Sequence, residues 1–317
     1  MNSLNGKHRD HSACSGCSLC LLACPVWHQT RDIRLTPHGR AKALQHGATA
    51  EEIAASIASC TLCGACAPAC PEEIDLVGMM LDLRKQHPLA PARVTTKMNG
   101  TAKAVLRAGG ASTLLLPGAG LRDDSARLAR IVALLGEGVA VADDDGSDIG
   151  LALEAGVAVN NERVARFLDG LRGATRLIVA EGIVHYALRR LLPGVRIEGL
   201  GEALSTLAPV RSRLRASDLY VIEPRAFHGD YNRLIGHYDG LRASRGCYMN
   251  LDLQRFAVPT TASSAQHALG LPGIDTAAQA RWILQGRTVE RIVVEDVADA
   301  AVFASVSGRP VVHLGDV

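Results

Sequence analysis

Eight of the nine cysteines in this chain of 317 residues fall into two motifs with identical spacing. Both motifs read C-x2-C-x2-C-x3-C-P, and they comprise Cys14, Cys17, Cys20, Cys24 and Pro25, then Cys60, Cys63, Cys66, Cys70 and Pro71. In this pattern, three thiolates of one loop reach three irons of a [4Fe–4S] cluster, and the fourth ligates the neighbouring cluster. The two motifs therefore predict two [4Fe–4S] clusters with crossed ligation.

Crossed ligation divides the eight thiolates between the two loops. One cluster is expected on Cys14, Cys17, Cys20 and Cys70, and the other on Cys60, Cys63, Cys66 and Cys24. Two other uses of cysteine are disfavoured. Disulfide frameworks are typical of small secreted domains, and the polar residues 1–13 lack the apolar core of a signal peptide. Zinc sites use paired C-x2-C knuckles, not three cysteines plus one.

Composition limits the number of domains, the class of partner and the cellular compartment. A chain of 317 residues, 48% of them hydrophobic, can form two or three domains with their own cores. Its net charge of +2 gives no indication of a nucleic-acid partner. No apolar run approaches the roughly 18 residues of a transmembrane segment. The many free thiols indicate a reducing compartment, so we expect a cytoplasmic protein, free or held at a membrane through a partner.

The first 98 residues carry helical signals around the cysteine loops. Thr49 to Glu52 form a capping box, and Ile53 and Ile57 follow one helical turn apart, which predicts a helix leading into the second loop. A second apolar stripe predicts a helix over residues 74–85. The two prolines of residues 87–92 predict a linker.

Beyond that linker, short apolar runs alternate with helical stretches, which is the βαβ pattern of parallel sheets. Strands are expected at residues 114–116, 139–141, 177–179, 195–197, 219–222, 291–294 and 310–313, and helices at 125–135, 160–171, 186–192 and 276–285. The fold class is therefore α+β and multidomain. It comprises a helical ferredoxin-like two-cluster domain (1–98) and two α/β repeats with mainly parallel sheets (99–210 and 211–317).

This arrangement resembles a known family. Two ferredoxin motifs with a helical insert and two α/β repeats look like the iron–sulfur subunits of anaerobic glycerol-3-phosphate dehydrogenase, glycolate oxidase and heterodisulfide reductase. The element Thr36-Pro-His-Gly-Arg40 resembles the Pro-x-Gly-Arg of that family. The resemblance implies that each α/β repeat corresponds to one cysteine-rich domain of the family.

The signature cysteines of both repeats are replaced in this chain. The corresponding positions are Ala119, Ser147, Asp148, Glu181 and Val184 in the first repeat, and Arg225, Pro259, Thr260, Asp296 and Asp299 in the second. Without thiolates, neither repeat can hold the additional cluster of some family members. We expect the acids at these positions to be solvated loop or helix-cap residues without a metal. Cys247 lies outside the signature and is expected to be a buried, inert thiol.

No sequence signal indicates a flavin, nicotinamide or nucleotide site. A cluster passes one electron at a time, whereas metabolites give up two, normally to a flavin. We therefore expect an electron-transfer subunit of an oxidoreductase, not a complete enzyme. Its partner would be a flavoprotein dehydrogenase, and its acceptor a quinone, a ferredoxin or an electron-transfer flavoprotein. The alternative is a heterodisulfide-reductase-like subunit with its own substrate or quinone site between the repeats; a cluster sensor is disfavoured. The sequence does not indicate which metabolite is oxidised or reduced.

Overall fold

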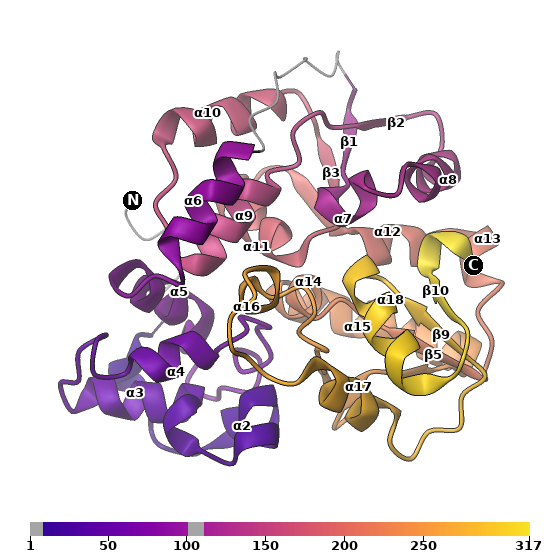
Figure 1. The fold of residues 1–317 in the computed structure, drawn as a ribbon. Helices are drawn as coiled ribbons and strands as arrows, with labels where there is room; N and C mark the ends of the chain where they lie inside the picture. The colour runs from indigo at the N-terminus through magenta and orange to yellow at the C-terminus, as the bar shows by residue number, and fades with distance from the viewer. Residues whose placement is uncertain (1–8, 101–110) are drawn as a thin grey trace.

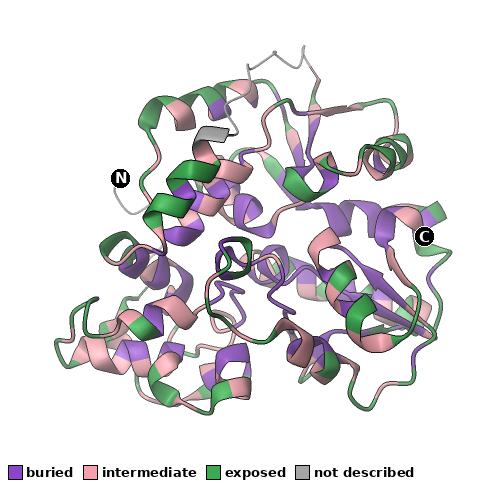
Figure 2. Ribbon diagram, viewed as in Figure 1, coloured by how far each residue is buried: buried purple, intermediate pink, exposed green. Residues whose placement is uncertain are grey.

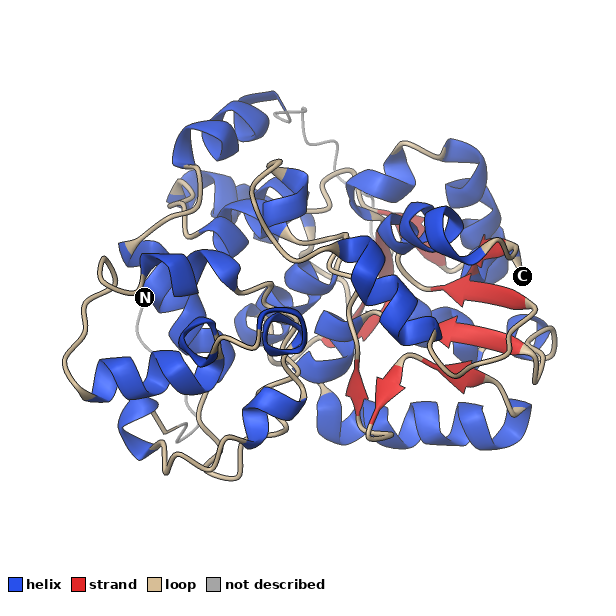
Figure 3. Ribbon diagram, turned by 60° about the horizontal axis from the view of Figure 1, so that its bottom comes forward, coloured by secondary structure: helices blue, strands red, loops and turns tan. Residues whose placement is uncertain are grey.

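The computed structural model describes residues 9–100 and 111–317 of the chain. A helical N-terminal part lies beside two α/β lobes (Figure 1). The strands are gathered in one half of the molecule (Figure 3). Both four-stranded sheets are entirely parallel, as the βαβ pattern predicts. The predicted α+β fold class is confirmed.

The helical part consists of short helices, two of which begin at side-chain caps. They are α1 (Leu19–Leu22), α2 (Pro25–Thr30), α3 (Pro37–Gln45), α4 (Ala54–Ser59) and α5 (Leu76–Gln86), with 3-10 turns at His11–Ala13 and Ile33–Leu35. Thr36 caps α3 by accepting a hydrogen bond from Gly39 N, and Asp75 caps α5 in the same way. The predicted capping box forms, because Thr49 N donates to Glu52 at 2.8 Å. Helix α4 follows it and ends directly before Cys60.

The predicted linker at residues 87–92 is wrong in part. Pro91 is the first residue of α6 (Pro91–Gly100), where its missing N–H costs nothing. Leu89 N donates to Ala155 O at 2.8 Å, and Leu89 and Val94 are buried against the first lobe. Pro91 therefore marks the start of a helix that packs on the first lobe, and this segment is not a free linker.

The first lobe has the strand order β2-β1-β3-β4. Its strands are β1 (Thr113–Leu116), β2 (Val139–Val141), β3 (Arg176–Val179) and β4 (Arg196–Gly199). Its helices are α7 (Gly118–Arg122), α8 (Ser125–Leu135), α9 (Ser147–Ala155), α10 (Asn161–Gly170), α11 (Gly182–Leu191), α12 (Leu200–Thr206) and α13 (Ala208–Arg211). The four strands predicted from apolar runs in this region are all present.

The second lobe has the order β10-β9-β5-β6. It comprises β5 (Asp218–Val221), α14 (Pro224–Gly229), α15 (Tyr231–Arg245), β6 (Tyr248–Met249), α16 (Ala265–Ala268), α17 (Thr276–Leu284), β9 (Arg291–Val294), α18 (Val297–Ser307), β10 (Val311–His313) and a 3-10 turn at Leu314–Asp316. A two-stranded antiparallel pair, β7 (Leu251–Asp252) and β8 (Phe256–Ala257), follows β6. Strands β6, β7 and β8 were not predicted, because two residues are too few for an apolar pattern.

The two lobes share one hydrophobic core. Leu115 and Ile178 of the first sheet belong to the same buried cluster as Tyr220 and Val293 of the second. Asp316, near the C-terminus, pairs with Arg127 and Arg130 on α8 of the first lobe. Figure 2 shows the buried residues concentrated in the strands and where the parts of the molecule meet.

A buried ion pair joins both lobes to the helical part. Arg225 of α14 donates to Glu154 of α9 at 2.9 Å, and both side chains are almost fully buried. Arg225 also donates to Thr61 O at 3.2 Å, in the loop that carries the second cysteine motif. Glu154 additionally accepts from Ala265 N at 2.8 Å. Three parts of the chain thus meet at one guanidinium and one carboxylate.

Loss of one member of this pair is expected to destabilise the protein strongly. Arg225→Met leaves the Glu154 carboxylate buried without its cation, which typically costs about 3–5 kcal/mol. The exposed pair Lys85–Asp82 is a matched control, since Lys85→Met is expected to cost less than about 1 kcal/mol. Denaturant unfolding of the iron-loaded protein measures both. Equal losses in the two variants would contradict the role given to the ion pair.

Candidate iron-sulfur centres

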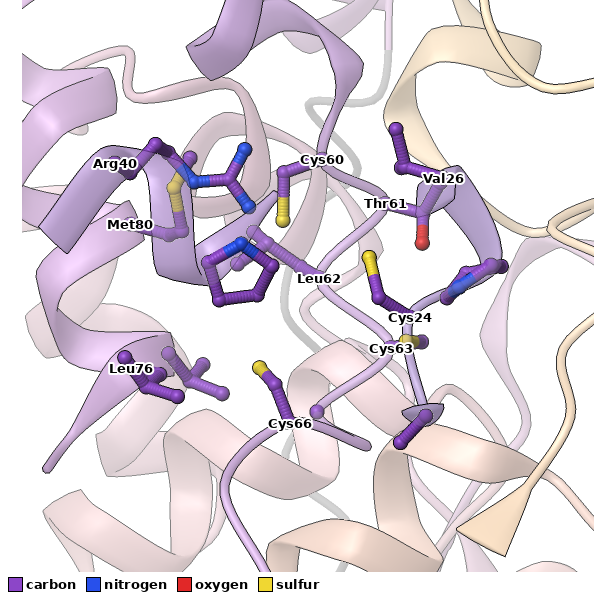
Figure 4. A pocket seen from close by; sticks show the side chains of 15 residues that line it. Cys24, Val26, Arg40, Cys60, Thr61, Leu62, Cys63, Cys66, Leu76 and Met80 are labelled. Atoms are coloured by element: carbon purple, nitrogen blue, oxygen red, sulfur yellow. The ribbon is translucent and has the colours of Figure 1, made fainter. Parts of the chain in front are cut away.

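Four cysteines from both motifs line one pocket. Cys24, Cys60, Cys63 and Cys66 surround it together with apolar side chains such as Leu76 and Met80. Figure 4 shows the sulfur atoms of all four turned toward the same space. Cys24 belongs to the first motif by sequence, yet it lies with the first three cysteines of the second motif. This is the set that crossed ligation predicts for one cluster.

Local backbone geometry positions these thiols. Cys24 is the residue before α2, and Pro25 occupies the first position of that helix. In the second loop, Leu62 and Gly64 adopt left-handed conformations with φ of 52° and 79°. A side chain at Gly64 would lie 3.0 Å from the Cβ of His228, so this glycine also permits close packing on the second lobe.

The other four cysteines gather near the protein surface. The charges of Cys24, Cys70, Cys14 and Cys17 all act on the thiol of Cys20, whose pKa rises to about 12, chiefly through burial. Cys70 of the second motif is thus close to the first loop. Cys17 is exposed, and Leu19 and Leu22 beside it are 45% and 48% exposed.

The two sets of thiols are neighbours. Cys66 of the pocket senses the charge of Cys20 in the surface set, and its pKa is raised well above the usual value by burial and by the nearby thiols. Burial likewise raises the pKa of Cys63 to about 12. Thiolates packed this closely need a compensating positive charge, which bound iron supplies. All nine cysteines are free of disulfide bonds.

One buried hydrogen-bond donor at the pocket is without an acceptor. Arg40 lines the pocket and is 1% exposed. Its Nη1 donates to Leu35 O and Ser56 O, but its Nε–H has no partner. Sulfide and thiolate sulfurs of a cluster accept such hydrogen bonds. The thiol set, the apolar lining and this unpaired donor all fit a [4Fe–4S] cluster.

Side chains from distant parts of the chain hold the carbonyls of the second loop. Arg84 of α5 and Gln266 of α16 both donate to Cys60 O. His228 of α14 donates through Nδ1 to Cys63 O at 2.8 Å, while its Nε2 accepts from Ala257 N. Burial lowers the pKa of His228 to about 4, so the imidazole is neutral near pH 7. The lobes therefore fix the backbone of the second loop. Motif spacing gave no signal for Arg84, His228 or Gln266.

The positions emptied of cysteine in the first lobe lie together. Glu181 follows β3, and its Oε1 accepts hydrogen bonds from Ala119 N and from the hydroxyl of Ser147, both at 2.9 Å. These are three of the positions at which the resemblance implies cysteines. A hydrogen-bonded carboxyl group thus links them.

The expectation that the acids at the signature positions are solvated or helix caps is wrong for Asp299. In the second lobe, the hydroxyl of Thr260 donates to Asp299, and both side chains are buried. Glu223 and Glu295 are also buried, being 6% and 5% exposed. Asp296 is a helix cap as expected, since it accepts from Ala298 N at the start of α18. Glu223 and Glu295 are buried because the carboxyl ends of the two sheets face each other: a side chain at Gly182 would meet Glu223, and one at Gly201 would meet Glu295. Among the described residues, no three His, Cys, Asp or Glu side chains are gathered as a single metal ion would require.

Cys247 and two histidines of the lobes lie in structural surroundings. Cys247 is buried in the core shared by the lobes, as predicted. His313 is buried, and its two ring nitrogens contact Glu295 O and Gly315 N. His237 is half-buried beside Ser205.

Comparison with known proteins identifies the helical part. Residues 10–74, which include all eight motif cysteines, match the 4Fe-4S dicluster domain family. The match does not extend into the lobes, and no curated protein or solved structure matches the chain. The chain thus contains an iron–sulfur domain of a type that binds [4Fe–4S] clusters and transfers electrons. None of the described helices is both long and apolar enough to cross a membrane.

Glu181 is expected to make stability depend on pH. Burial raises the pKa of this carboxyl to about 7. Its neutral form therefore contributes stability fully below pH 4.5, and this contribution is lost as the pH rises through 7. Glu181→Gln retains the accepting oxygen without the charge. We expect unfolding free energies equal to wild type near pH 5 and higher by about 1–3 kcal/mol at pH 8.5. The exposed Glu162→Gln is the control, and an equal change at both pH values would contradict this assignment.

Proposed function

We propose that this chain is the electron-transfer subunit of a larger oxidoreductase and carries two [4Fe–4S] clusters in series. The surface cluster is held by Cys14, Cys17, Cys20 and Cys70, and the interior cluster by Cys24, Cys60, Cys63 and Cys66. The observation that carries the proposal is the adjacency of two four-cysteine sets, one at the surface and one buried. Two neighbouring one-electron centres form a relay, because each can reduce the next.

A flavoprotein dehydrogenase is the proposed partner. Clusters take electrons singly, and a flavin converts the two-electron oxidation of a metabolite into single steps. The exposed Cys17, with the exposed apolar side chains of Leu19 and Leu22, supports docking of a partner beside the surface cluster. The acceptor would be a quinone, a ferredoxin or an electron-transfer flavoprotein. The proposed role is that of the iron–sulfur subunits which the chain resembles, those of anaerobic glycerol-3-phosphate dehydrogenase, glycolate oxidase and heterodisulfide reductase.

Crossed ligation is tested by comparing the spectra of cysteine variants from the two motifs. Anaerobically purified protein is expected to contain about eight irons and eight acid-labile sulfides. Cys24→Ser is expected to lose the interior cluster and give the same electron paramagnetic resonance spectrum as Cys63→Ser. Cys70→Ser is expected to match Cys17→Ser instead. If the spectrum of Cys24→Ser matched that of Cys17→Ser, each motif would bind its own cluster and the crossed assignment would fail.

A cavity favours a second candidate function, in which this chain itself reduces a quinone. The cavity has a volume of about 660 Å³, within the usual range for small-molecule sites. Gly64 and Cys70 of the second loop form one side of it, and Tyr186 and Tyr231 of the lobes form another. The hydroxyl of Tyr186 is buried without a partner and could donate to a quinone oxygen. The quinone would take one electron from each cluster and two protons from water to become a quinol.

Soluble naphthoquinone tests this second function. Dithionite-reduced protein, freed of excess reductant, is expected to be reoxidised at a rate that saturates with quinone concentration. Tyr186→Phe removes one hydrogen bond and is expected to raise the half-saturating concentration about three- to tenfold. Tyr248→Phe, at an exposed tyrosine of β6, is the control. A rate that stays linear in quinone, identical in all three proteins, would mean collision at the surface and no binding site.

A further inference from the structure

We propose that Arg40 and Arg84 are the counter-ions of the interior cluster and raise its reduction potential above that of the surface cluster. The inference rests on the proposed cluster at Cys24, Cys60, Cys63 and Cys66. It adds a direction to the relay, because electrons then move from the surface cluster inward.

Both guanidinium groups are buried without a carboxylate partner. Arg40 is 1% exposed and Arg84 is 0% exposed, and neither lies within ion-pair distance of an acid in the described part of the chain. Arg225, by contrast, is buried against Glu154 at 2.9 Å. A buried cation without an anion costs several kcal/mol, so the protein needs a negative group near Arg40 and Arg84.

The four-cysteine pocket is where that negative charge would be. Arg40 lines the pocket, and Figure 4 shows its guanidinium beside Cys60. Arg84 donates through Nη2 to Cys60 O and through Nη1 to Glu154 O. The Nε–H of each arginine is buried and lacks an acceptor. Arg40 thus places an unpaired donor and a buried cation at the pocket, and the buried cation of Arg84 lies close enough to interact with the thiol of Cys60.

The charge of the cluster completes the arrangement. A [4Fe–4S] core held by four thiolates is a net anion, and reduction adds one negative charge. Positive charge nearby therefore favours the reduced form and raises the potential. Burial alone acts in the opposite direction, because a low dielectric disfavours the more highly charged reduced form. Two buried cations oppose this penalty most strongly where water is excluded, since Coulomb interactions grow as the dielectric falls.

In the described part of the chain, the three buried arginines line the pocket or bind the second loop, and none donates to the first loop. A cation that does contact the first loop is Lys42 of α3, whose Nζ donates to Cys14 O at 2.8 Å from a half-exposed position. Cys17 is open to solvent, which screens charge around this site. The two sites therefore differ in their buried positive charge, although the two motifs have the same cysteine spacing. This asymmetry is what sets the order of the potentials.

A purely structural role for Arg40 is the competing explanation. Its Nη1 links Leu35 O to Ser56 O and so ties the segment before α3 to α4. Such a role would affect stability and cluster loading, but it would leave the potential of a correctly assembled cluster unchanged. The test therefore has to measure potential, with iron content as a separate readout.

The experiment is a potentiometric titration of the full chain, followed by electron paramagnetic resonance. In wild type, the interior cluster, assigned by its absence in Cys24→Ser, is expected to be reduced first. Arg40→Met and Arg84→Met are each expected to lower the equilibrium constant for reduction of the interior cluster about tenfold. For one electron, this corresponds to a potential lower by about 59 mV. Arg40→Lys keeps the charge and is expected to recover most of the loss. Arg34 is exposed and lies just before α3, the helix that carries Arg40. Arg34→Met is expected to leave the reduction potentials of both clusters unchanged.

The outcomes separate this inference from the proposed function. Absence of a cluster in the pocket of the wild type would refute the ligand assignment itself. A loaded interior cluster with the same potential in wild type, Arg40→Met and Arg84→Met would overturn the counter-ion role alone, as would a wild-type surface cluster of higher potential. If Arg40→Met does not load iron, Arg40→Lys and Arg84→Met decide: an unchanged potential in Arg84→Met refutes the inference, and a tenfold fall supports it.

Discussion

The buried ion pair between Arg225 and Glu154 is the interaction on which the arrangement of this molecule depends. It joins α14 of the second lobe to α9 of the first, and Arg225 also holds Thr61 O of the second cysteine loop. An ion pair so far from water is stable only when its remaining donors and acceptors are satisfied. Here the protein satisfies them with backbone groups from separate parts of the chain, namely Thr61 O, Ser263 O and Ala265 N. If the lobes and the cysteine loop moved apart, both buried charges would lose their partners. The protein is therefore most stable with these parts in contact.

The same junction explains what the lobes do without thiolates. Arg225 stands where the resembled family has a cysteine, and here it contacts the loop of the interior site directly. His228, one helical turn further along α14, holds Cys63 O, and Gln266 holds Cys60 O. Glu181 with Ser147, and Thr260 with Asp299, are hydrogen-bonded at positions where the resemblance implies cysteines. Side chains of the lobes thus hold the backbone of the second cysteine loop.

The two cysteine sets differ in environment far more than in sequence. The surface set lies beside exposed Leu19 and Leu22, whereas the pocket set is enclosed by apolar side chains and by buried Arg40. Two further buried arginines, Arg84 and Arg225, bind backbone carbonyls of its loop. Cluster potentials depend on nearby charge and solvent exposure, both of which differ between the two sets. In the proposed relay, the surrounding protein would therefore give a direction to two motifs with identical spacing.

The sequence by itself determined the chemistry and most of the regular structure. The cysteine spacing identified the iron–sulfur domain, because ligand geometry restricts which separations can bind one cluster. Apolar runs located β1 to β5, β9 and β10, because fully buried parallel strands are continuously hydrophobic. Only the tertiary structure decided which environment each site has. Arg40 and Arg84 are buried by the fold, and the pair of Arg225 with Glu154 joins residues 71 positions apart. Local patterns describe a residue and its neighbours along the chain, whereas burial and charge compensation depend on what the fold packs against them.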